Sequence, residues 1–171
     1  TRVEAFLHCV REDLRGGPGR SPNPEDVLTV RPRTMEELRR TRERVLIPRM
    51  GPAAGALAAV LRGLGLPAEA LPEPTRDTLR IGRRHTSGKE CYPALLTVGD
   101  MLRQVRRSDF DPARSAFFMA ATDGPCRFGQ YRHLHRLVLD GIGLSDVPLY
   151  VVDQDETLTE DLRLVGGQEF E

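Results

Sequence analysis

Apolar residues in the central part of the chain follow two different patterns. Short continuous or β-branched runs, which are typical of buried strands, occur at 44–50, 78–82, 116–122 and 147–153, with a shorter one inside 68–75. Stretches with helical spacing or an alanine-rich composition lie at 51–65, 91–107 and 128–143. Strands and helices alternate, which predicts an α/β domain with a mainly parallel sheet. We expect three layers in a Rossmann-like or flavodoxin-like order.

The first 43 residues have a different character. An apolar stripe predicts a first helix, residues 16–33 predict a linker rich in Pro, Gly and Arg, and Thr34 to Glu37 has the capping-box form that opens a short charged helix. We therefore divide the chain into this N-terminal part, 1–43, and an α/β domain, 44–171, whose tail holds one more short helix. The chain begins with Thr1, and we interpret it as a piece of a larger protein.

Composition narrows the functional classes. The chain is 39% hydrophobic and 29% charged, with 25 basic and 25 acidic residues and no Trp. The balanced charge and scarce aromatics argue against a nucleic-acid partner. No apolar run approaches the roughly 18 residues of a membrane span, so we expect neither a membrane partner nor a signal peptide. Three cysteines are too few for a disulfide framework, which favours a soluble protein of the reducing cytoplasm.

Cys91 and Cys126 occupy similar places in the predicted pattern. Each lies at or just before a helix N-terminus and follows a predicted strand through a glycine-containing loop, SGKEC and DGPC. Because the carboxyl ends of parallel strands share one edge of a sheet, we expect both cysteines to converge there. A helix N-terminus favours a thiolate over a thiol, and thiolates bind soft metals and iron–sulfur clusters. The two cysteines are therefore candidate metal ligands.

Each cysteine also has a plainer interpretation. An isolated cysteine in a soluble domain is usually a small buried apolar residue, and a disulfide switch between Cys91 and Cys126 is a third alternative. Cys9 lies beside the apolar stripe of the first predicted helix and is a weaker candidate ligand.

Other polar residues near the two cysteines leave alternatives open. The loop that contains Ser87 and Lys89 is either a small-anion site or a plain surface loop. His133 and His135 are two positions apart, so they do not readily share a metal ion, and we expect a solvated helix face there. Tyr92 and Tyr131 either donate a hydrogen bond near the site or pack in the core; we favour packing.

Three segments of the chain carry a resemblance to a known family. These are residues 47–74, 88–102 and 123–147, and their most specific pieces are E-C-Y-P, with G-D-M-L behind it, and G-P-C-R-F-G-Q-Y. They resemble bacterial proteins related to 2-hydroxyacyl-CoA dehydratases, in particular the dehydratase-like portion of the fused CoA-substrate-specific enzyme activases. The resemblance covers roughly residues 44–153.

The resemblance implies a cofactor and partners. Proteins of this kind hold a [4Fe–4S] cluster, or a double-cubane cluster in some relatives, in Rossmann-like domains whose cysteines are the ligands. An ATP-dependent activase delivers single electrons to that cluster, which then acts on a 2-hydroxyacyl-CoA or drives another difficult reduction. Cys91 and Cys126 match the cluster cysteines, and a third ligand comes from Cys9 or from another domain of the full-length chain.

Our leading hypothesis is therefore an iron–sulfur-binding domain of a dehydratase-like reductase. Ser87, Lys89, Arg127 and Gln130 are expected to line the cluster pocket around Cys91 and Cys126. We expect the isolated piece to be inactive as an enzyme and to lose its cluster when purified in air. The alternative is a non-catalytic Rossmann-like binding or scaffold domain with structural cysteines.

Overall fold

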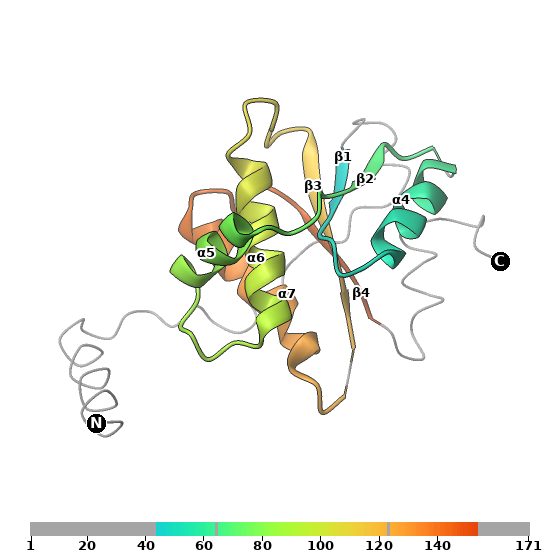
Figure 1. Cartoon of the computed structure of the whole chain (residues 1–171). Coiled ribbons are helices and arrows are strands. Elements are labelled where there is room, and N and C mark those ends of the chain that lie inside the picture. The colour runs from blue at the N-terminus through green and yellow to red at the C-terminus, as the bar shows by residue number, and fades with distance from the viewer. Residues whose placement is uncertain (1–43, 64, 123, 154–171) are drawn as a thin grey trace, which may run out of the picture.

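Four parallel strands form the centre of the molecule (Figure 1). A computed structural model describes residues 44–63, 65–122 and 124–153. The strands are β1 (Arg44–Ile47), β2 (Ala68–Ala70), β3 (Ser115–Ala121) and β4 (Leu149–Asp153), in the spatial order β2-β1-β3-β4. The predicted α/β fold with a parallel sheet is confirmed, and the arrangement is consistent with a Rossmann-like or flavodoxin-like domain.

Strand β3 lies between β1 and β4 in the sheet, and this position explains the continuous apolar run from which the strand was predicted. Phe117 pairs with Leu46 of β1 and Leu149 of β4, and these side chains share the core on one face of the sheet. Ala116 and Phe118 belong to the core on the opposite face. Because both faces of the strand are covered, its residues from Ala116 to Ala121 are all apolar, as is usual in parallel sheets.

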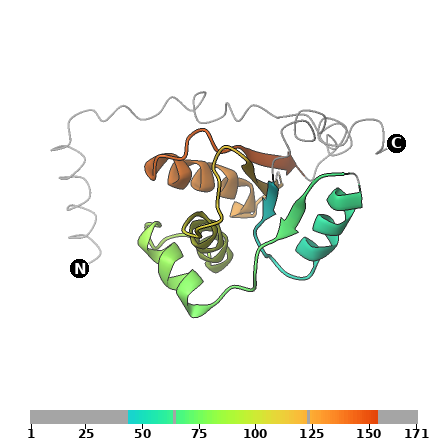
Figure 2. The same cartoon turned by 90° about the horizontal axis from the view of Figure 1, so that it is seen from above.

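Helices cover both faces of the sheet (Figure 2). The connection from β1 to β2 is α4 (Ala53–Gly63), which lies on one side. On the other side lie α5 (Arg76–Arg84), α6 (Tyr92–Val105) and α7 (Tyr131–Gly141), the last preceded by the 3₁₀ turn η1 (Arg127–Gln130). The chain leaves β1 toward β2 and later crosses to β3 on the other side, so the strand order reverses between β1 and β3. Ligands of such sheets usually bind outside the carboxyl ends of the strands at this reversal.

The predicted strand at 78–82 is wrong, because these residues lie within α5. The helix begins with a capping box: Thr75 and Thr78 each accept a hydrogen bond from the other's backbone N–H. Thr78, Ile81 and Gly82 then share the buried face. A Cβ atom on Gly82 would clash with the backbone carbonyl of Leu95, so glycine permits the close packing of α5 against α6. The crossover from β2 to β3 therefore contains two helices.

The other elements predicted between residues 44 and 153 are present within the described residues. Helices lie at the predicted places 51–65, 91–107 and 128–143, and the short strand inside 68–75 is β2. The elements predicted for 1–43 and for the tail after 153 lie outside the described residues. Among the residues that the structure describes, no helix is long and apolar enough to cross a membrane.

Candidate functional site

The two candidate cysteines begin two neighbouring helical segments. Cys91 is the N-cap of α6, with an extended backbone (φ −72°, ψ 155°), and its carbonyl accepts the backbone N–H of Ala94 at 3.0 Å. Pro93 lies in the first turn of α6, where the missing N–H costs no hydrogen bond. Cys126 is the N-cap of η1 and is also extended (φ −75°, ψ 134°). Neither side chain makes an N-capping hydrogen bond to its own helix, so both sulfur atoms are available for other contacts.

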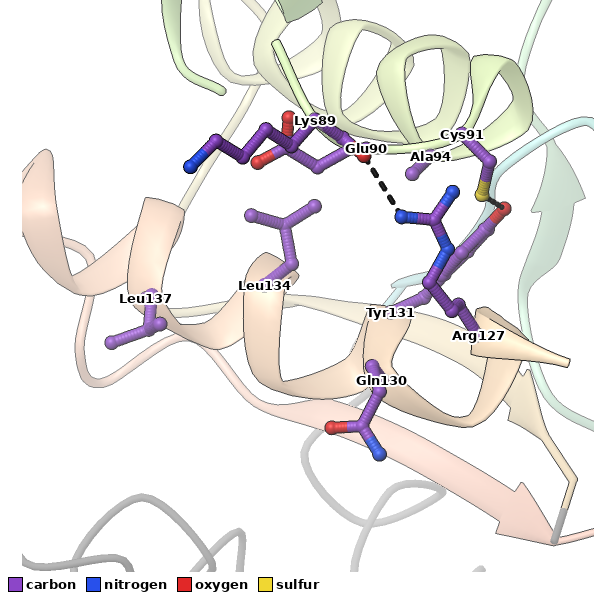
Figure 3. A pocket seen from close by; sticks show the side chains of 9 residues that line it. All are labelled: Lys89, Glu90, Cys91, Ala94, Arg127, Gln130, Tyr131, Leu134 and Leu137. Carbon is purple, nitrogen blue, oxygen red and sulfur yellow. Dashed lines mark hydrogen bonds between the residues drawn. The ribbon is translucent and has the colours of Figure 1, made fainter. Parts of the chain in front are cut away.

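The expectation of two matching strand-to-helix junctions is wrong for Cys91. Its loop joins α5 to α6, because residues 78–82 are helical, whereas the loop of Cys126 does follow β3. The two loops nevertheless meet, since α6 and α7 lie on the same side of the sheet. The guanidinium of Arg127 donates a hydrogen bond of 2.8 Å to the backbone carbonyl of Lys89, and Cys91 Sγ lies 2.6 Å from the Tyr131 hydroxyl (Figure 3).

Tyr131 is held firmly beside Cys91. The ring is 5% exposed and makes an edge-on contact with Phe128, with ring centroids 5.1 Å apart. Gly129 allows η1 to approach the end of β3, because a Cβ atom there would clash with the carbonyl of Thr122. Burial, followed by the interaction with Cys91, raises the pKa of Tyr131 well above its usual value. The phenol therefore stays protonated at neutral pH and can donate its O–H to a Cys91 thiolate. Sequence patterns favoured packing for Tyr131, and the residue both packs and hydrogen-bonds.

A cavity of about 300 Å³ opens between the start of α6 and the first turns of α7 (Figure 3). This volume is at the lower end of the range of small-molecule sites. Its walls combine polar and charged groups near the two loops with apolar side chains farther along α7. The lining residues are Lys89, Glu90, Cys91, Ala94, Arg127, Gln130, Tyr131, Leu134 and Leu137.

Three of the four predicted pocket residues line this cavity, namely Lys89, Arg127 and Gln130. Ser87 does not line it; its N–H and hydroxyl both donate to the Glu90 carboxylate, at 3.0 and 2.9 Å. Cys126 is exposed and lies next to Arg127, outside the set of lining residues. The structure thus brings Cys91 and the Arg127 turn together around one cavity, and Cys126 is not among the residues that line it.

The loop before Cys91 already contains an anion of its own. Gly88 has a left-handed backbone (φ 84°), which turns the chain so that its N–H donates to Glu90 at 2.9 Å, beside the donors of Ser87. Burial acts to raise the pKa of Glu90, but the hydrogen bonds from Ser87, Gly88 and its own backbone N–H together outweigh it and lower the pKa to about 2. The donors that favoured a small-anion site in the sequence are therefore occupied by a carboxylate of the same loop.

His135 shows where reasoning from the sequence missed a buried polar contact. It was expected on a solvated helix face, but it is fully buried, and its Nε2 lies 2.9 Å from the hydroxyl of Thr97 on α6. Burial lowers the pKa of His135 to about 3, so the ring is neutral. His133 is partly exposed on the same helix. The two histidines point in different directions, as their spacing predicted.

The described residues offer few side chains that could together hold a metal ion. Cys91 and Cys126 are both free thiols, and Cys9 lies outside the described residues. Among the described residues, no three or more His, Cys, Asp or Glu side chains gather as a metal site would require. The fold and site thus define a parallel α/β domain with two free cysteines in loops that meet. No protein-family model, curated protein or solved structure matches the chain.

Proposed function

We propose that Cys91 and Cys126 are thiolate ligands of an iron–sulfur cluster in a dehydratase-like reductase. The observation that supports this most strongly is the junction of their two loops. These loops are far apart in the sequence, yet the Arg127–Lys89 hydrogen bond and the contact of Cys91 with Tyr131 tie them together. Both sulfurs are free, and both lie at the surface or partly so. Soft thiolates in this setting suit the iron ions of a cluster better than they suit hard cations.

The donor set fits such a cluster as a partial ligand shell. Iron–sulfur clusters are usually held by several cysteine thiolates, and the described residues offer two. The remaining ligands are then Cys9, or cysteines of another domain of a larger chain. A partial shell also explains why no group of three metal ligands is found within the described residues. We expect the cluster to be exposed and to be lost when the protein is handled in air.

Residues around the junction have distinct supporting roles in this proposal. The Tyr131 hydroxyl donates to the Cys91 sulfur and fixes its direction, as outer-shell hydrogen bonds do at metal sites. The Arg127 guanidinium places positive charge at the junction of the two loops, while Ala94, Leu134 and Leu137 form an apolar wall. The cluster would supply single-electron transfer. In keeping with the family resemblance, we propose that an ATP-dependent activase supplies the electrons and that an acyl-CoA is the substrate class.

Anaerobic reconstitution of the whole chain with iron and sulfide tests this proposal. Wild-type protein is expected to develop visible absorption and an electron paramagnetic resonance signal after reduction. Cys91→Ala and Cys126→Ala are each expected to bind much less iron, and Cys9→Ala shows whether Cys9 is a further ligand. Ser87→Ala is the matched control, because Ser87 is exposed near the junction but does not line the cavity. If both cysteine variants bind as much cluster as wild type, the proposal is wrong.

A second candidate function is a binding or scaffold domain with structural cysteines. One observation favours it: Cys91 is half-buried and packs against the core cluster that contains Tyr131. In that case replacement of Cys91 by alanine should lower stability without changing the iron content after reconstitution. The iron content of folded Cys91→Ala protein therefore separates the two candidates.

A further inference from the structure

The outward face of α5 carries a concentrated positive charge. Helix α5 packs against α6 through its buried residues and lies at the outer edge of the helical layer (Figure 2). Four arginines on the opposite side of α5 are exposed, and together with Leu79 they line one hollow; they are Arg76, Arg80, Arg83 and Arg84. Because they recur three or four positions apart, their side chains are neighbours on one side of the helix. We call this surface the α5 arginine face.

Little of this charge is compensated within the described part of the chain. Asp77 is the one acidic residue of α5, and its carboxylate forms an ion pair of 3.0 Å with Arg80. The side chains of Arg76, Arg83 and Arg84 form no ion pair or hydrogen bond with another described residue. Like charges at this spacing destabilise a helix. An anionic partner on this face would therefore gain ion pairs and also relieve the repulsion among the arginines.

The chain itself contains a segment of the opposite charge. Residues 154–171 lie outside the described residues, and their sequence holds six acidic residues and one arginine. Residues 44–153 hold 15 basic and 11 acidic residues, and residues 1–43 are nearly balanced, with nine and eight. The equal totals of the whole chain thus conceal a positive α/β domain followed by a negative segment.

This acidic segment is long enough to reach α5. It follows Asp153, the last residue of β4, and 18 extended residues span up to about 60 Å. That length exceeds the width of a domain of about 100 residues, whose radius of gyration is about 13 Å. Covalent linkage gives the segment an effective concentration on the order of millimolar at the surface of its own domain. Exposed ion pairs, which are weak one by one, are therefore better satisfied by this segment than by a free anion.

We infer that the acidic segment 154–171 docks on the α5 arginine face of its own chain. Its carboxylates would pair with Arg76, Arg83 and Arg84, which lack such partners, and Leu79 would offer apolar surface between them. None of these residues lines the cavity beside Cys91, so the inference concerns a second surface of the molecule and does not depend on a cluster.

Cleavage of the native full chain by a glutamate-specific endoprotease tests this inference. Glu156 and Glu160 lie in the acidic segment, and a docked segment is cleaved mainly when it detaches. The double variant Arg83→Gln, Arg84→Gln removes two ion-pair partners and keeps polar side chains. It is expected to release the segment about fivefold faster, which corresponds to about 1 kcal/mol for two exposed ion pairs. In wild type, 0.5 M NaCl should also speed cleavage, because salt screens exposed charges. Mass spectrometry follows the released fragments, and free peptides of the same sequence correct for effects on the protease itself.

Two further variants identify the partners. Arg106→Gln, Arg114→Gln removes the same charge from exposed arginines outside the α5 arginine face and should leave the cleavage rate unchanged. Asp155→Asn, Asp161→Asn removes charge from the segment and should speed cleavage, but it should add little when combined with the α5 variant, because both break the same pairs. The inference is overturned by equal rates in wild type and the α5 variant, by an equal increase in the Arg106, Arg114 control, or by fully additive effects. Protection that increases with protein concentration would assign the segment to a second copy and would also overturn it. The cysteine-variant reconstitution reports on other residues, so either proposal can fail without the other.

Discussion

Replacing Asp100 by asparagine is expected to stabilise the domain at neutral pH and to change little in acid. Asp100 is nearly fully buried, and this burial outweighs the hydrogen bond from the Arg49 N–H and the charge of Arg103, raising the pKa from 3.8 to about 6. At 1.36 kcal/mol per pKa unit, this shift of about two units means that ionised Asp100 costs about 3 kcal/mol in the folded state. Asparagine resembles the protonated form and avoids that cost.

The direction of the pH dependence follows from the protons bound. Between pH 3.8 and about 6 the folded state binds more protons at Asp100 than the unfolded state does. The free energy of unfolding therefore falls as the pH rises through this window and stays low above it. The gain from Asp100→Asn should grow over the same window, from near zero at pH 3.5 to about 3 kcal/mol at pH 7, as an order of magnitude.

His135 acts in the opposite direction in the wild-type protein. Burial lowers its pKa from 6.5 to about 3, so the unfolded state binds more protons between these values. Its contribution makes the free energy of unfolding fall as the pH drops below 6.5. The two effects overlap between about pH 4 and 6, where they partly cancel in the wild type. The difference between wild type and Asp100→Asn removes the His135 contribution and isolates Asp100.

Urea unfolding of the two proteins at several pH values between 3.5 and 7, followed by far-ultraviolet circular dichroism, provides the measurement. Asp109→Asn is a matched control, because Asp109 is exposed and its hydrogen bonds with Arg107 lower its pKa. The control should show no gain that grows with pH. A gain from Asp100→Asn that is independent of pH, or a loss of stability at pH 7, would refute the reasoning.

Three further predictions rest on single contacts. Gly82→Ala should destabilise the domain by about 1–3 kcal/mol, near the upper end, because the new Cβ atom would clash with the backbone of α6. Gly55→Ala has open space around the new Cβ atom and should stabilise the domain by about 0.5–1 kcal/mol. Thermal unfolding of the two variants measures both effects. Thr75→Ala removes the capping box of α5 and should cost about 1 kcal/mol in urea unfolding. Brief alkylation of the native chain should modify exposed Cys126 faster than half-buried Cys91, and equal rates by mass spectrometry would contradict the contact with Tyr131.

The sheet could be predicted from the sequence because its strands are buried on both faces. The run from Ala116 to Ala121 carries apolar side chains at every position, and its flanking helices have clear apolar stripes. The segment 78–82 failed because Thr78 and Ile81 are β-branched, and because Leu79 and Ile81 are two positions apart, a spacing that fits a strand over so few residues. Two features favour a helix for this segment: the capping partner Thr75 and the close packing of Gly82 against α6. The packing of Gly82 depends on the position of α6, which local sequence does not reveal.

Part of the candidate site could also be predicted, because local sequence signals mark where helices begin. Local sequence places Cys91 and Cys126 at helix starts, because proline and glycine mark those boundaries. The tie between Arg127 and the carbonyl of Lys89 depends on how α6 and α7 pack side by side. Local pattern carries no information about such a contact, and the same limit applies to the buried contact of His135 with Thr97.

The iron and sulfide contents of anaerobically reconstituted protein test the central proposal most directly. Wild-type chain should retain both elements after desalting, and the double variant Cys91→Ala, Cys126→Ala should retain only the background of a protein without ligands. Circular dichroism of both proteins before reconstitution checks that the double variant is folded. Equal iron and sulfide in the two folded proteins would contradict the proposal that these thiolates hold a cluster.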